Sequence, residues 1–128
     1  MNEHNLESAI NSYLECALWS SIDDNCYPLD GDYSIDDCSD SLKVSAKNDI
    51  LDFFELCQEA GLIGEYIERV GMVWGAQFGH DFWLTRNGHG AGFWDRGFGK
   101  LGGELTRLAK SYGTVDLYVT FTGEVTGE

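Results

Sequence analysis

Apolar residues recur every three or four positions over four stretches of the chain, which is the spacing of one helix face. The clearest example is the stretch after Asn5, where Leu6, Ile10, Tyr13 and Leu14 fall on one stripe and Asn5 can act as the N-cap. Gly61 follows the second stretch and is a fitting residue for the end of a helix. The pattern predicts helices over residues 5–19, 42–60, 62–70 and 99–111.

Alternating apolar and polar residues, the pattern of a half-buried strand, occupy residues 79–86, 91–96 and 115–120. Asn87-Gly88 separates the first two stretches and is a strong hairpin-turn signal. We therefore predict a hairpin followed by a third strand, and a frayed tail over residues 122–128. If the third strand lies parallel to a hairpin strand, helix 99–111 forms a right-handed crossover.

These elements predict an α+β fold, with a small antiparallel or mixed three-stranded sheet on which about four helices pack. The 128 residues suit a single domain. Within it we expect an acidic helix and loop over residues 1–42, a helical region over 43–76, and a hairpin-helix-strand unit over 77–121.

Four cysteines occur without a C-x-x-C pair, which favours reduced structural thiols. No apolar run approaches the roughly 20 residues of a membrane-spanning helix. The N-terminus is acidic and polar, unlike a signal peptide. These observations predict a cytoplasmic protein without a membrane partner.

Charge is distributed unevenly along the chain, whose formal net charge is −14. Ten acidic residues precede Lys43, the first lysine or arginine. Between residues 77 and 113 the balance reverses, with five lysines and arginines against three acids. The acidic half should repel nucleic acid and attract basic protein surfaces. We expect partner binding by the aspartates of its loop: Asp23, Asp24, Asp30, Asp32, Asp36, Asp37 and Asp40.

Another group of candidate residues lies in Gly79–Gly97, GHDFWLTRNGHGAGFWDRG, which is rich in glycine, aromatic and charged residues. In a hairpin with a two-residue turn, His80 faces Asp95, while His89 lies apart at the turn. With a four-residue loop, Asp81 faces Arg96 and Trp83 faces Trp94 instead. The first arrangement favours a structural hydrogen bond over a metal site, and no known metal-binding spacing is present. The candidate ligand-binding residues are His80, Asp81, Arg86, His89, Asp95 and Arg96.

Glycines at positions 88, 90 and 92 suggest two uses for the same stretch. Their backbone N–H groups could hold an anion between Arg86 and Arg96. They also supply the positive φ angles of a tight turn, and the spacing matches no known phosphate-binding motif.

Other site chemistry finds little support in the sequence. Asp30 and Asp32 resemble the start of an EF-hand loop, but Ile35 replaces its glycine and Ser41 its final glutamate. No G-x-S-x-G motif occurs, and no cysteine has an evident histidine partner. We predict no cofactor and favour a binding protein over an enzyme. Trp83 and Trp94 belong either to the core or to a protein interface.

Four blocks of the sequence are similar to a family of small proteins encoded by tailed bacteriophages. They are YLECALWSSIDD, PLDGDYSIDD, GHDFWLTRNGHGAGFWDRG and LAKSYGTVDLYV. The chain departs from that family over residues 43–78 and after Val119. The resemblance implies a phage or prophage accessory protein that works in the bacterial cytoplasm. The family has no established activity, so it implies no catalytic residue.

Charge and resemblance together suggest three functions. An acidic phage protein can inhibit a host defence enzyme of the CRISPR or restriction type, because carboxylates compete with nucleic acid for phosphate-binding lysines and arginines. The partner would then be the basic surface of a nucleic-acid-binding protein. The alternatives are a ligand- or metal-binding module or enzyme centred on the His80–Arg96 hairpin, and a non-catalytic structural or adaptor protein of the phage.

Overall fold

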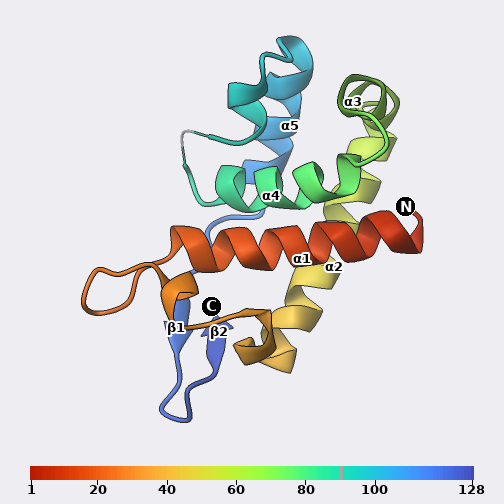
Figure 1. Ribbon diagram of the computed structural model, residues 1–128. Coiled ribbons are helices and arrows are strands. Elements are labelled where there is room, and N and C mark those ends of the chain that lie inside the picture. The colour runs from red at the N-terminus through yellow and green to blue at the C-terminus, as the bar shows by residue number, and fades with distance from the viewer. Residues whose placement is uncertain (90) are drawn as a thin grey trace.

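The computed structural model describes residues 1–89 and 91–128, which form a mostly helical protein with one small sheet (Figure 1). This arrangement is α+β in the broad sense predicted, but five helices and two strands replace the expected four and three. The helices are α1 (Glu3–Ser20), α2 (Asp40–Glu59), α3 (Ile63–Val70), α4 (Trp74–Arg86) and α5 (Lys100–Lys110). The strands are β1 (Leu117–Val119) and β2 (Val125–Gly127), and three short 3-10 turns are η1 (Leu29–Gly31), η2 (Ile35–Asp37) and η3 (Phe93–Arg96).

Four helices lie where the apolar spacing predicted them, with ends that differ by no more than two residues. The N-cap of α1 is Asn2 rather than the predicted Asn5, because the Asn2 side chain accepts the N–H of Asn5 at 2.8 Å. Ser39 caps α2 in the same way, accepting the N–H of Leu42 at 3.0 Å. Local periodicity and capping therefore explain these helices.

The predicted hairpin is wrong. Residues 79–86 form the second half of α4, and residues 93–96 form η3 instead of a strand. The Asn87-Gly88 pair ends the helix: Gly88 has φ +77°, and its N–H donates to the carbonyl of Thr85. The same two residues that favour a hairpin turn thus serve as a helix stop.

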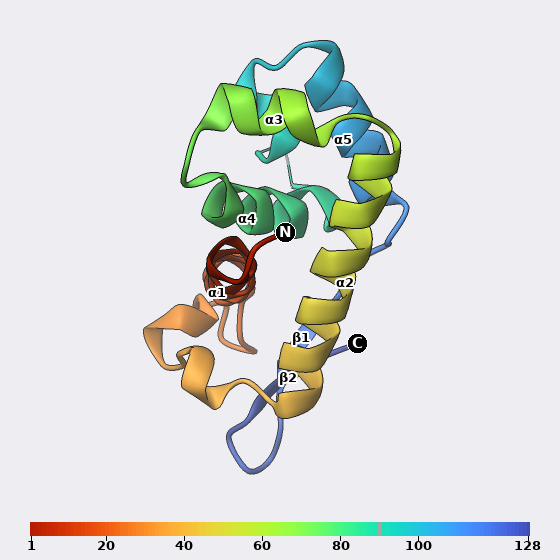
Figure 2. The same cartoon turned by 90° about the vertical axis from the view of Figure 1, so that its right-hand side faces the viewer.

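Close packing of α4 against α1 explains the glycines of α4. Gly75 and Gly79 lie one turn apart, against Asn5 and Ala9 of α1. A Cβ atom at Gly79 would lie 2.0 Å from the carbonyl oxygen of Ala9, and one at Gly75 would lie 2.5 Å from that of Asn5. Figure 2 shows α1 end-on beside α4, with α2 running alongside.

The third predicted strand exists at Leu117–Val119, but its partner is the tail rather than a hairpin strand. β1 and β2 are antiparallel, with Tyr118 opposite Thr126, so the mixed sheet, the crossover and the frayed tail are wrong. Val125 is fully buried and forms a parallel bridge with Cys38. The N–H of Ser39 donates to the carbonyl of Val125 at 2.7 Å. The tail thereby fixes the start of α2.

An aromatic cluster forms the centre of the core. The ring of Phe53 on α2 stacks on Phe82 and Phe78 of α4, with centroids 4.2 and 5.0 Å away. Trp83 is also buried, and its indole N–H donates to Ser20 at 2.8 Å. Trp94, in contrast, is 71% exposed. The two tryptophans that the sequence left undecided therefore have different environments.

Candidate functional site

Asp81 and Arg96, two of the predicted ligand-binding residues, are paired with each other. Arg96 donates from Nε and Nη2 to the two carboxylate oxygens of Asp81, at 2.9 and 2.8 Å. Nδ1 of His80 lies 3.0 Å from the same carboxylate, whose side chain is fully buried. Such a bidentate pair is a strong charge-assisted contact. It joins η3 to α4, and both oxygens of the buried Asp81 carboxylate already accept hydrogen bonds.

Arg86 is also used by the fold. Its guanidinium donates to Asp49 at 2.7 Å, to the hydroxyl of Tyr13 at 3.1 Å, and to two backbone carbonyls at Tyr112 and Gly113. The side chain is 5% exposed and joins α1, α2, α4 and the segment after α5. Burial raises the pKa of Tyr13 to about 12, so its hydroxyl stays protonated.

The six predicted ligand-binding residues do not gather into one site. The predicted pairing of His80 with Asp95 is wrong, because His80 contacts its neighbour Asp81 and Asp95 is exposed. His89 is exposed after the end of α4, and Gly90 of the suggested anion cradle lies outside the described residues. Over residues 1–89 and 91–128, no three His, Cys, Asp or Glu side chains come together to hold a metal ion.

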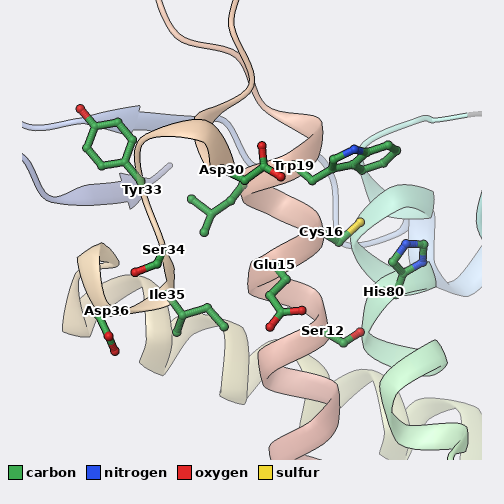
Figure 3. Close-up of a pocket in the computed structure, with 11 residues that line it drawn as sticks. Ser12, Glu15, Cys16, Trp19, Asp30, Tyr33, Ser34, Ile35, Asp36 and His80 are labelled. Carbon is green, nitrogen blue, oxygen red and sulfur yellow. The ribbon is translucent and has the colours of Figure 1, made fainter.

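A groove of about 610 Å³ lies between α1 and the segment that contains η1 and η2 (Figure 3). One face of α1 forms its first wall, through residues spaced three or four apart. The facing wall comes from residues 30–36, and His80 of α4 closes one side. The lining residues are Ser12, Glu15, Cys16, Leu18, Trp19, Asp30, Tyr33, Ser34, Ile35, Asp36 and His80.

The groove combines negative charge with an aromatic surface. Glu15, Asp30 and Asp36 are exposed, and within the described residues none of them forms an ion pair. Trp19 is 58% exposed. Carboxylates attract cations, and an indole face adds a cation–π contribution. The groove is therefore suited to a positively charged group with a flat or apolar part.

Cys16 does not act as an activated nucleophile in this groove. The residue is 3% exposed, and burial together with the nearby Asp81 raises the pKa of its thiol to about 12. The thiolate is the nucleophilic form of cysteine, and it is scarce at neutral pH when the pKa is raised. Cys16 is therefore not suited to covalent catalysis in this groove.

The seven aspartates of the acidic segment divide into two groups. Asp23 accepts the backbone N–H groups of Asn25 and Tyr27, at 2.8 and 3.0 Å. Asp37 accepts the N–H of Ser34 at 2.9 Å, so both carboxylates hold the local backbone. The carboxylates of the other five are exposed and, in the part of the chain that the structure describes, accept no hydrogen bond: Asp24, Asp30, Asp32, Asp36 and Asp40.

Four lining residues of the groove are not among the predicted site residues: Ser12, Glu15, Trp19 and Tyr33. The available signal was the second face of the first helix, where Ser12, Glu15 and Trp19 recur at spacings of three and four. A tryptophan on the polar face of an amphipathic helix is a reason to expect a contact with another molecule.

No family model, curated protein or solved structure matches this chain. Among the described helices, none is long and apolar enough to cross a membrane.

Proposed function

We propose that the protein binds the basic, nucleic-acid-contacting surface of a partner protein and blocks it. One observation carries this proposal. Residues 1–42 contain ten acids and no lysine or arginine, and the ion pairs found in the described chain all use other residues. Surfaces of small domains ordinarily mix both signs of charge, so a large one-sign field suits electrostatic steering toward an oppositely charged partner.

The C-terminal end of α1 adds to the negative electrostatic potential of residues 1–42. The C-terminus of a helix carries a partial negative charge, and basic residues in the last turn usually compensate it. α1 has no basic residue in its last turn and leads directly into the acidic segment. Nucleic-acid-binding proteins gain much of their affinity from lysine and arginine contacts with phosphates. Carboxylates held in this field compete for the same cations.

The resemblance to bacteriophage proteins supports a particular class of partner. A phage protein of this kind meets restriction endonucleases and CRISPR effectors in the bacterial cytoplasm, and both hold nucleic acid in basic channels. We therefore propose a phage accessory protein that inhibits one of these defence enzymes. It acts without a cofactor and without binding nucleic acid itself.

Charge reversal tests the proposal. We expect the wild type to bind and inhibit a member of a panel of purified restriction and CRISPR enzymes, with loss of binding at high salt and displacement by DNA. The variant Asp24→Lys, Asp30→Lys, Asp32→Lys, Asp36→Lys should lose both effects. It spares Asp23 and Asp37, whose carboxylates hold the backbone.

A matched control changes the net charge equally on other exposed acids, with Glu55→Lys, Glu59→Lys, Glu68→Lys and Asp95→Lys. This control should keep inhibition to within a few-fold. Equal loss in both variants would show that only net charge matters and would contradict a specific acidic surface. A partner that DNA does not displace would instead indicate an adaptor or structural role.

A further inference from the structure

We propose that the groove between α1 and residues 30–36 receives an arginine side chain of the partner protein. That the arginine belongs to a partner protein rests on the proposed function. That the groove binds an arginine side chain rests on the residues that line the groove. A volume of about 610 Å³ lies within the roughly 300–1,000 Å³ range of clefts that hold small ligands. It accommodates one long side chain together with part of the loop that carries it.

Hydrogen-bonding capacity identifies a donor-rich ligand. Glu15, Asp30 and Asp36 present carboxylate oxygens, which only accept hydrogen bonds. His80 lies beside them with Nδ1 directed to Asp81, at 3.0 Å. A guanidinium group has five N–H donors and no acceptor, which complements this set.

The aromatic wall distinguishes arginine from lysine. Trp19 is 58% exposed on the same face of α1 as Glu15 (Figure 3). A planar guanidinium stacks on an indole face and still donates in its own plane, whereas an ammonium group is a compact, strongly hydrated charge. Leu18 and Ile35 also line the groove and can contact the aliphatic part of the arginine side chain.

A buried group of the same wall remains without a partner. Cys16 is 3% exposed, lines the groove and forms no hydrogen bond within residues 1–89 and 91–128. Figure 3 shows its sulfur on the side of α1 that faces His80. Sulfur is a weak acceptor for an N–H donor. Charge complementarity, an exposed indole and an unpartnered buried thiol together indicate one occupant.

Short peptides provide the test. The protein, labelled with ¹⁵N, is titrated by NMR with acetyl-Gly-Arg-Gly-amide, with its lysine analogue, and with a citrulline analogue that keeps the shape of arginine without its charge. We expect the arginine peptide to shift the Trp19 indole N–H and the amides of Glu15 and His80. The lysine peptide should bind several-fold more weakly, and the citrulline peptide should cause no shift.

Variants locate the binding site. The pair Glu15→Gln, Asp36→Asn should weaken the arginine peptide about tenfold, because it removes charge-assisted hydrogen bonds. Trp19→Ala should abolish the preference for arginine over lysine. Glu7→Gln, which changes another exposed carboxylate on the same helix and outside the groove, is the control and should leave affinity unchanged.

The outcomes separate this inference from the proposed function. No shift at Trp19, equal binding of the lysine peptide, or unchanged affinity in the Glu15/Asp36 pair overturns the arginine site. If inhibition of a nucleic-acid enzyme persists in that case, the proposed function stands without it. Arginine binding in the groove, with no inhibition of any enzyme in the panel, supports the site and contradicts the proposed function.

Discussion

Two regions of this protein are rich in charged residues, and they use them in opposite ways. In residues 79–97, Asp81 and Arg86 point into the interior and have fixed partners. In residues 21–40, most carboxylates face solvent, and in the described structure they have no cationic partner. The comparison teaches that a conspicuous motif can serve the fold, while most carboxylates of a plain acidic loop stay in solvent.

Energetics explain the difference. A buried charge is costly unless it is paired and hydrogen-bonded, so a buried pair must stay complete. An exposed carboxylate remains solvated, and most surface substitutions change stability by less than about 0.5 kcal/mol. Mutations in the two regions should therefore affect different properties: stability in the first and partner binding in the second.

The largest expected effect is that of Arg86→Met. This change leaves the Tyr13 hydroxyl, the Asp49 carboxylate and two backbone carbonyls without their donor, and it removes the ion pair between α2 and α4. We expect a loss of about 3–5 kcal/mol in the free energy of unfolding, measured by urea denaturation. Arg69→Met is the control, because Arg69 is exposed, its ion pair within the described residues is with Glu65 one turn away, and its guanidinium lies 5.8 Å from the centre of the Phe98 ring. Similar losses in both variants would contradict a structural role specific to Arg86.

Gly79→Ala should have the next largest effect. Its Cβ atom would meet the backbone of Ala9 at 2.0 Å, so α1 and α4 must move apart, at a cost of about 2–3 kcal/mol. Gly103→Ala is the matched control, because a Cβ atom there meets nothing within 4 Å and should stabilise α5 by up to about 1 kcal/mol. Thermal unfolding of both variants checks the prediction, and a neutral Gly79→Ala would contradict the close packing.

The smallest expected change in stability distinguishes two neighbouring aspartates, Asp36 and Asp37. Asp37→Asn should lower stability by about 1 kcal/mol, because it weakens the contact with the N–H of Ser34. Asp36→Asn should be neutral for stability and should weaken binding of the arginine peptide instead. Urea denaturation and the peptide titration, applied to both variants, measure the two effects. An equal loss of stability in both would remove the distinction between backbone-holding and free carboxylates.

The sequence predicted the helices that have one apolar face and missed the helix that does not. On α2, Ile50, Phe53, Phe54 and Cys57 are buried on one side, so their spacing is visible along the chain. On α4, nearly every residue from Phe78 to Arg86 is buried. A helix surrounded by the core has no polar stripe to define its period. The Asn87-Gly88 signal then led to the hairpin prediction.

The groove could not be predicted because it depends on contacts between distant parts of the chain. Glu15 and Asp36 belong to different elements, and only the packing of α1 against the acidic segment brings both to one groove. The sequence also gave no reason to treat Asp36 and Asp37 differently. Their roles separate through the short turn η2, in which Asp37 accepts a backbone N–H group. The predicted partner-binding role of the aspartates stays a prediction.

The contact between β2 and the start of α2 has a consequence for synthesis on the ribosome. The hydroxyl of Ser39 donates to Thr126, 87 positions further along the chain, and Val125 forms a parallel bridge with Cys38. A contact over so long a separation closes late, because the intervening chain must first be made and ordered. The end of the acidic segment therefore gains its final anchor after the helices have emerged. An incomplete chain carries the carboxylates but not the finished surface.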